Sequence, residues 1–328
     1  TLGLTESNNI ANKELKPEIT TEFEVGVTAN FFDNRLTFDG AFYDKNTKNQ
    51  IIAAALAPES GYTTRTRNVG KIGNRGIEIM LGGTPVKFGD WKLDLGVTFT
   101  KNWSKVKELW DNVDEYTLTS SYQVSYVAEV GKPLGQFKIP AVAKTADGKT
   151  IVTSSGFPKI DSNKTETLGT SNSRFQMGFT TRISWKDLSL SAVVDWRNGG
   201  YFYCYTAQLY YFSGNATPTV YNNRAPFIVP NSVKQLSNGT YVENDIPIRT
   251  YNTYNWYNNA QNYSMYKNWV LKKDYVKLRE LVISYNLPKS ICEKVGFIKG
   301  VTVSLIGRNL FMWTPAENNF VDPESSNY

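Results

Sequence analysis

TTEFEVGVTANFFDNRLTFDGAFYDK, residues 20–45, alternates apolar and polar side chains over two segments that a tight turn joins. In the first segment Phe23, Val25 and Val27 share one face, and Glu22 and Glu24 share the other. Successive side chains of a β-strand point to opposite faces of the sheet, so each segment reads as a strand with one apolar and one polar face. The stretch therefore predicts a β-hairpin that turns at residues 33–34.

The same pattern recurs three more times along the 328 residues of the chain. The sequence predicts eight strands in four hairpins, at residues 20–45, 75–105, 174–197 and 275–311. Between the hairpins the connections are far longer than the usual hairpin loop of two to five residues. These long connections cover residues 48–73, 106–173, 198–274 and 312–328.

Short turns at one end of the strands and long loops at the other are typical of outer-membrane barrels. No run approaches the roughly 18 consecutive apolar residues of a membrane helix, whereas a barrel strand needs only about 9 to 11 residues and is polar on its lumen side. The pattern favours an all-β, antiparallel transmembrane β-barrel segment with long extracellular loops. Two alternatives stay open: a small closed barrel of eight strands, and a soluble or surface-attached glycan-binding β-sandwich.

Composition argues against several other classes of function. The net charge is +6, but the Lys and Arg residues are spread along the chain, so we expect no nucleic-acid partner. Histidine, the commonest general base and metal ligand, is missing from the sequence. We therefore expect no enzyme activity, no catalytic residues, no cofactor and no metal site. Cys204 and Cys292 lie at opposite ends of the predicted strands, and we expect two unpaired thiols.

Several short motifs resemble the SusC/RagA branch of the TonB-dependent receptors. They occur in family order along almost the whole chain. The segments that carry the resemblance are NKELKPEITTEFEVG at 12–26, NVGKIGNRGIE at 68–78, YVKLREL at 275–281, SYNLP at 284–288, RNL at 308–310 and DPE at 322–324.

The resemblance implies a 22-stranded barrel in the outer membrane of Bacteroidetes that imports oligosaccharides or peptides. It also implies a SusD-like lipoprotein lid, contact with outer-membrane lipid, and energy from TonB-ExbB-ExbD acting through an N-terminal part. On this basis residues 1–328 are expected to be a partial C-terminal barrel, strands 14 to 21, with the plug domain and the final strand absent.

The long connection 198–274 interleaves aromatic residues with asparagines. Aromatic rings offer apolar platforms and Asn both donates and accepts hydrogen bonds, a combination that suits sugars and peptides. The residues proposed to contact substrate or lid are Tyr201, Tyr203, Tyr251, Tyr254, Trp256 and Tyr257. The alternative is that these residues pack the core of the loop itself.

A second candidate set comprises the charges predicted to face the barrel lumen. They are Glu22, Glu24, Asp39, Glu78, Asp94, Arg174, Arg182, Asp195 and Arg197. Charges in this position either guide solute or pair with one another and with the plug, and the sequence favours pairing.

Overall fold

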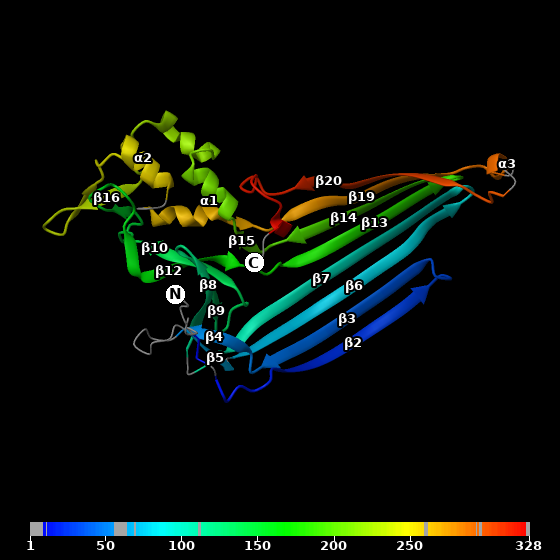
Figure 1. The fold of residues 1–328 in the computed structure, drawn as a ribbon, viewed down its shortest axis with the longest axis horizontal. Helices are drawn as coiled ribbons and strands as arrows, with labels where there is room; N and C mark the ends of the chain where they lie inside the picture. The colour runs from blue at the N-terminus through cyan, green and yellow to red at the C-terminus, as the bar shows by residue number, and fades with distance from the viewer. Residues whose placement is uncertain are drawn as a thin grey trace, which may run out of the picture.

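A single antiparallel sheet of eight strands dominates the chain (Figure 1). The computed structural model describes residues 9–10, 12–55, 64–68, 70–110, 113–258, 262–292, 294 and 297–325. Neighbours in the sheet follow one another in sequence. The strands are β2 (Ile19–Phe31), β3 (Leu36–Lys48), β6 (Lys71–Phe88), β7 (Trp91–Glu108), β13 (Phe175–Trp185), β14 (Leu188–Asn198), β19 (Tyr275–Asn286) and β20 (Thr302–Trp313). The expected antiparallel fold class is confirmed.

The two faces of this sheet differ in polarity, as the period-two pattern predicts. One row of directly paired residues is apolar across all eight strands. It consists of Ala29, Phe38, Leu81, Val97, Phe179, Val194, Leu278 and Phe311. The next row lies on the opposite face and is largely polar. It consists of Thr28, Asp39, Met80, Thr98, Gly178, Asp195, Lys277 and Met312.

Nothing in the described part of the chain covers the apolar face. Leu305 is 73% exposed there and Val303 is 59% exposed. A soluble sandwich would bury such a face against a second sheet, but the eight-stranded sheet stands as a single layer (Figure 1). The sandwich alternative is therefore wrong, and the uncovered face requires an apolar solvent such as a lipid bilayer.

Aromatic rings border the apolar face at both ends. Near the tight turns, Trp91 and Trp185 stack with their ring centroids 5.8 Å apart. At the other end, Phe175 lies 5.8 Å from Phe99 and 5.0 Å from Trp196. Such girdles mark the two membrane interfaces of outer-membrane barrels, because aromatic rings combine an apolar body with a polarisable or polar edge.

The edges of the sheet remain open. β2 and β20 are its two outer strands, and no ladder joins them among the described residues. This rejects the alternative of a small closed barrel of eight strands. Since unpaired backbone groups in lipid cost several kcal/mol each, both edges require further strands.

The short connections lie at one end of the sheet and the long ones at the other (Figure 1). Phe32, Asp33 and Asn34 turn the first hairpin with positive φ, and Lys186 does so in the third. β19 and β20 are joined by a longer connection that contains the short helix α3 (Lys289–Cys292). No helix in the described ranges is long and apolar enough to cross a membrane.

The long connections contain regular structure, which the sequence does not predict. Four small sheets form there, and β1 (Asn9–Ile10), which precedes β2, joins one of them. Their other strands are β4 (Ile51–Ala55), β5 (Thr64–Asn68), β8 (Glu115–Ser121), β9 (Val124–Glu129), β10 (Gln136–Val142), β11 (Thr150–Val152), β12 (Ile160–Thr170), β15 (Tyr201–Tyr203), β16 (Ser232–Gln235), β17 (Tyr241–Glu243) and β18 (Val270–Lys272). The helices are α1 (Tyr205–Phe212), η2 (Thr217–Arg224), α2 (Thr250–Tyr257), η3 (Tyr263–Trp269) and η5 (Pro323–Ser325).

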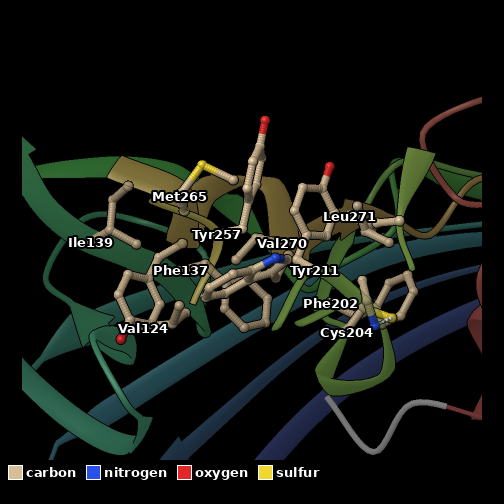
Figure 2. Packing of buried hydrophobic residues seen from close by; sticks show 14 residues of the cluster. Val124, Phe137, Ile139, Phe202, Cys204, Tyr211, Tyr257, Met265, Val270 and Leu271 are labelled. Carbon is tan, nitrogen blue, oxygen red and sulfur yellow. Dashed lines mark hydrogen bonds between the residues drawn. The ribbon is translucent and has the colours of Figure 1, made fainter. Parts of the chain in front are cut away.

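Most of the buried hydrophobic side chains lie in these connections, and only a few, such as Val106 of β7, belong to strands of the large sheet. Trp269 is fully buried among Phe137, Phe202 and Tyr266, which β10, β15 and η3 supply. Figure 2 shows this cluster beside the sheet. Cys204 belongs to it, and Cys292 is buried in α3. Both cysteines are free thiols, as the sequence predicts.

Candidate functional site

Most of the aromatic side chains proposed as contacts help to build the core of the long connections. Tyr201 and Tyr203 lie on β15, half-buried, and pack against the cluster around Trp269. The Tyr203 hydroxyl donates to Gln208 Oε1, and burial raises the pKa of this tyrosine. Tyr257 is buried, and its hydroxyl donates to the Pro218 carbonyl at 2.9 Å.

Trp256 joins two parts of that core. Its ring lies 6.1 Å from the Phe157 ring, stacked, and 5.4 Å from the Phe227 ring, edge-on. It packs against both the cluster around Trp269 and a second cluster that contains Phe157 and Ile248. The side chain of Tyr251 lies outside the described residues.

Tyr254 differs from its neighbours because it is 51% exposed. Its ring meets the Phe212 ring edge-on at 6.3 Å. On α1, Tyr205, Leu209 and Phe212 follow the four- and three-residue spacing of one helix face, and all three are about half exposed. We call the exposed side chains of Tyr205, Leu209, Phe212 and Tyr254 the aromatic ridge. It carries no charge.

A cavity of about 390 Å³ adjoins the ridge between α1, η2 and α2. Tyr211, Phe212, Tyr254 and Tyr257 line it together with Arg224. The Arg224 guanidinium donates to the Gly214 carbonyl at 2.8 Å. Ridge and cavity together give this end of the molecule an exposed apolar surface with a recess, which is the form of a contact site for a protein or a solute.

The predicted lumen charges share the polar face of the sheet, and most have partners there. Glu22 Oε2 lies 3.9 Å from Lys45 Nζ, and Asp94 Oδ2 lies 2.8 Å from Lys92 Nζ. The Thr28 hydroxyl donates to Asp39 Oδ2 at 2.6 Å. These contacts favour pairing over solute guidance for the residues concerned.

The remaining predicted charges occupy different parts of the same face. Glu22, Glu24 and Glu78 line a shallow recess of about 380 Å³ with Tyr43 and Lys45. Arg182 lies directly opposite Asp94 in the ladder. Arg174 precedes β13, and Asp195 and Arg197 lie on β14.

The structure adds a charge cluster around Asp195, whose other members lie in the motifs 275–281 and 322–324 and are not among the predicted lumen charges. Lys277 Nζ lies 2.6 Å from Asp322 Oδ1 and 2.5 Å from Glu324 Oε2. Arg279 Nε lies 2.6 Å from Asp195 Oδ2, and its Nη2 also pairs with Glu324. We call these five residues the mouth cluster.

Two features of the chain bring the mouth cluster together. A β-bulge places Arg279 as an extra residue between Leu278 and Glu280, so that its side chain reaches Asp195 on the neighbouring strand. The DPE segment at 322–324 then folds back onto β19, where the Tyr275 hydroxyl donates to Glu324 Oε1 at 2.8 Å. The Arg279 guanidinium holds the pKa of Glu324 far below its usual range. The sequence does contain a signal for the mouth cluster: two basic residues lie two positions apart in 277–279, and two acids lie in 322–324.

Among the residues described, no three His, Cys, Asp or Glu side chains gather closely enough to hold a metal ion. The arrangement therefore offers contact surfaces and paired charges, and its chemistry is that of binding.

A family model described as TonB dependent receptor-like, beta-barrel, matches residues 3–310. TonB-dependent receptor P3 of Formosa agariphila is 22% identical over 341 residues, which cover 97% of this chain and 32% of that protein. TonB-dependent receptor SusC of Bacteroides thetaiotaomicron is 23% identical over 193 residues, 55% of this chain and 19% of SusC.

Among solved structures, the RagAB peptide transporter is similar with a TM-score of 0.72 and 22% identity, covering 96% of this chain and 33% of that chain. At this identity the likeness concerns the fold. The chain spans about a third of the length of the P3 receptor and of the RagAB chain.

Proposed function

The chain belongs to the family of TonB dependent receptor-like β-barrels, which lie in the outer membrane, and from this premise we propose that it forms part of the wall of a nutrient importer. The observation that carries the proposal is the sheet with an uncovered apolar face, a polar face and two open edges. The eight strands would be a continuous portion of a larger barrel, numbers 14 to 21 of 22, with the long connections outside the cell. Import would be driven by TonB-ExbB-ExbD.

The proposed solutes are oligosaccharides or peptides. Support comes from the aromatic ridge and its cavity, because ring faces and tyrosine hydroxyls suit both sugar rings and peptide side chains. Tyr254 is the one described member of the predicted contact set that is exposed at this surface, so it carries the proposed contact.

The proposed partner is a SusD-like lipoprotein that covers the long connections. Exposed, uncharged aromatic side chains are enriched at the centre of protein interfaces. The ridge supplies three such side chains together with Leu209, and all four are about half exposed, although the Tyr122 ring stacks on Tyr205 at 6.3 Å.

Extraction and co-purification test these proposals. The full-length protein should need detergent for extraction and should co-purify with a lipoprotein. Leu209→Asp combined with Tyr254→Ala should reduce the amount of lipoprotein retained at least tenfold. Tyr241→Ala is the matched control, because Tyr241 is also about half exposed but lies on β17, away from the ridge. Extraction without detergent would refute the membrane assignment, and equal retention by both variants would refute the ridge as the contact.

A further inference from the structure

Three lysines of the described chain are more than nine-tenths buried, and two of them have carboxylate partners. Lys138 pairs with Glu115 and with Glu129, at 2.8 Å from the latter. Lys277 pairs with two acids of the mouth cluster. Lys273 is only 6% exposed, yet no ion pair or side-chain hydrogen bond to its Nζ occurs among the described residues, and the Nζ atom itself still contacts solvent. A buried charge is normally paired, because leaving water without a partner is costly.

A second cation lies next to Lys273 and is also incompletely satisfied. Arg197, near the end of β14, donates from Nη2 to the Ser171 carbonyl at a long 3.5 Å. Its Nε is buried without a partner in the described structure. Burial, and secondly the charge of Arg197, lower the pKa of Lys273 to about 8. At neutral pH Lys273 is therefore predominantly charged.

The nearest acidic residue in sequence is already engaged. Asp274 Oδ1 accepts from Asn198 Nδ2 at 3.0 Å and from the Gly199 backbone N–H at 2.9 Å. The Lys273 backbone N–H donates to the Gly200 carbonyl at 2.8 Å, which fixes the lysine beside the end of β14. The fold thus places Lys273 and Arg197 near each other, while the Asp274 carboxylate is held by Asn198 and Gly199.

The position of this pair is also informative. In the sheet, Arg197 lies directly opposite Gln176 on β13 and Tyr275 on β19. These residues belong to the row of the polar face that also contains Glu78. Lys273 lies two residues before Tyr275, where the long connections join the sheet. The pair therefore lies on the polar side of the sheet at the end where the long connections begin.

We propose that Lys273 and Arg197 form a binding site for a carboxylate group. A guanidinium presents a planar fork of N–H donors that matches a carboxylate, and an ammonium adds a compact charge with three donors. The unpartnered Arg197 Nε and the Lys273 ammonium supply both. The identification of an imported solute as the carrier of the carboxylate rests on the proposed function, whereas binding of the anion does not.

Thermal unfolding of the full-length protein in detergent tests the site. At matched ionic strength and pH 7, sodium acetate should raise the unfolding temperature by about 2 °C or more relative to sodium chloride, because a ligand that binds only the folded state stabilises it. Lys273→Met should abolish the difference. Lys272→Met is the control and should keep it, because the adjacent Lys272 pairs with Glu317 at 3.1 Å and is largely exposed.

A second arm distinguishes sources of the carboxylate. A short N-acetylated peptide with a free C-terminal carboxylate should compete with acetate, and the same peptide with a C-terminal amide should not. Competition by the acid alone supports a solute carboxylate, and binding of acetate without competition supports a site for small free anions. An equal response to acetate and chloride would overturn the proposal. So would a Lys273→Met protein that is less stable than the wild type, since this would mean that another part of the protein already supplies an acid. Because no transport is measured, failure here leaves the import proposal untouched.

Discussion

Lys277 Nζ lies 2.6 Å from Asp322 Oδ1, which ties β19 to the segment that follows β20. The lysine side chain is almost fully buried, whereas both of its carboxylate partners retain contact with solvent. Phe320 of the same segment packs edge-on against Tyr210 of α1 at 5.7 Å. The segment thus connects the barrel strand to the core of the long connections through one polar and one apolar contact.

Removal of the acids should loosen this connection. In Asp322→Asn/Glu324→Gln the buried Lys277 loses both carboxylates, and we expect a loss of about 2 kcal/mol in the free energy of unfolding. This is below the usual cost of breaking a fully buried pair, because the acids are partly exposed. Urea unfolding measures it. The control is Arg308→Gln, whose 3.0 Å pair with Glu280 is mostly exposed and should contribute about 0–1 kcal/mol. Equal losses in the two variants would contradict a special role for Lys277.

Acid should have the same effect as the substitution. The pKa of Glu324 is lowered in the folded state, chiefly by its hydrogen bond to Arg279, from an ordinary value of 4.5. Its contribution to stability is therefore fully present above about pH 4.5 and is lost as the pH falls further. The difference in stability between the wild type and Glu324→Gln should be constant from pH 7 to 5 and shrink between pH 4.5 and 3. A difference that grows on acidification would have the wrong sign.

The strands could be predicted from sequence because the signal is local. The alternation of Phe23, Val25 and Val27 with Glu22 and Glu24 directly reports a sheet with two different faces. Counted back from Leu281 and Ile283 without a bulge, the same rule would put Lys277 on their apolar face, whereas in the structure it lies on the polar face. The rule could not reveal the bulge at Arg279, because the register of a bulge depends on the partner strand.

The fold of the long connections could not be predicted in this way. Trp256 packs against Phe157 and Phe227, which come from other segments of the chain, and no periodicity in the sequence predicts that contact. Composition also cannot separate a tyrosine that packs from one that binds. Tyr257 and Tyr254 lie on the same helix, but only Tyr254 is exposed.

Substitution of these helix neighbours should separate packing from binding. Trp256→Ala removes a ring from the junction of two core clusters and should cost about 3–5 kcal/mol. Tyr254→Ala should change stability by about 0.5 kcal/mol or less, as for other exposed positions. Tyr254→Ala should nevertheless weaken binding of lipoprotein or solute. Thermal unfolding and pull-down, measured on the same preparations, check both outcomes. If Tyr254→Ala binds normally, the one described member of the predicted contact set that is exposed is not a contact, and the proposed contact is refuted.

Lys273 should make stability rise with pH. Its folded pKa of about 8 lies below the ordinary value of 10.5, so folding disfavours the charged form. The resulting penalty, on the order of 3 kcal/mol, is fully present below about pH 8 and is relieved as the pH rises toward 10.5. Lys273→Met should therefore be more stable than the wild type at pH 7, with the advantage falling by pH 10. Saturating acetate should reduce the advantage at pH 7, because a bound carboxylate compensates the charge. An advantage that does not depend on pH would show that Lys273 acts through its volume alone.

Two adjacent positions of β7 test the orientation of the sheet in the membrane. Val97 belongs to the apolar row and lies between the two aromatic borders, six residues from Trp91 and two from Phe99, whereas Thr98 belongs to the polar row. Arginine on the lipid face costs up to roughly 2–4 kcal/mol, with the full cost at the midplane, while the lumen tolerates charge. Val97→Arg should therefore reduce the amount of folded protein in the outer membrane, seen as loss of the heat-modifiable band on gels. Thr98→Arg should insert normally, because its side chain is exposed on the polar face. Since the two substitutions add the same side chain one residue apart, differences in expression or helix propensity cannot explain a selective loss. The reverse result, with Thr98→Arg failing and Val97→Arg inserting, would mean that the face assigned to lipid is the one that lines the lumen.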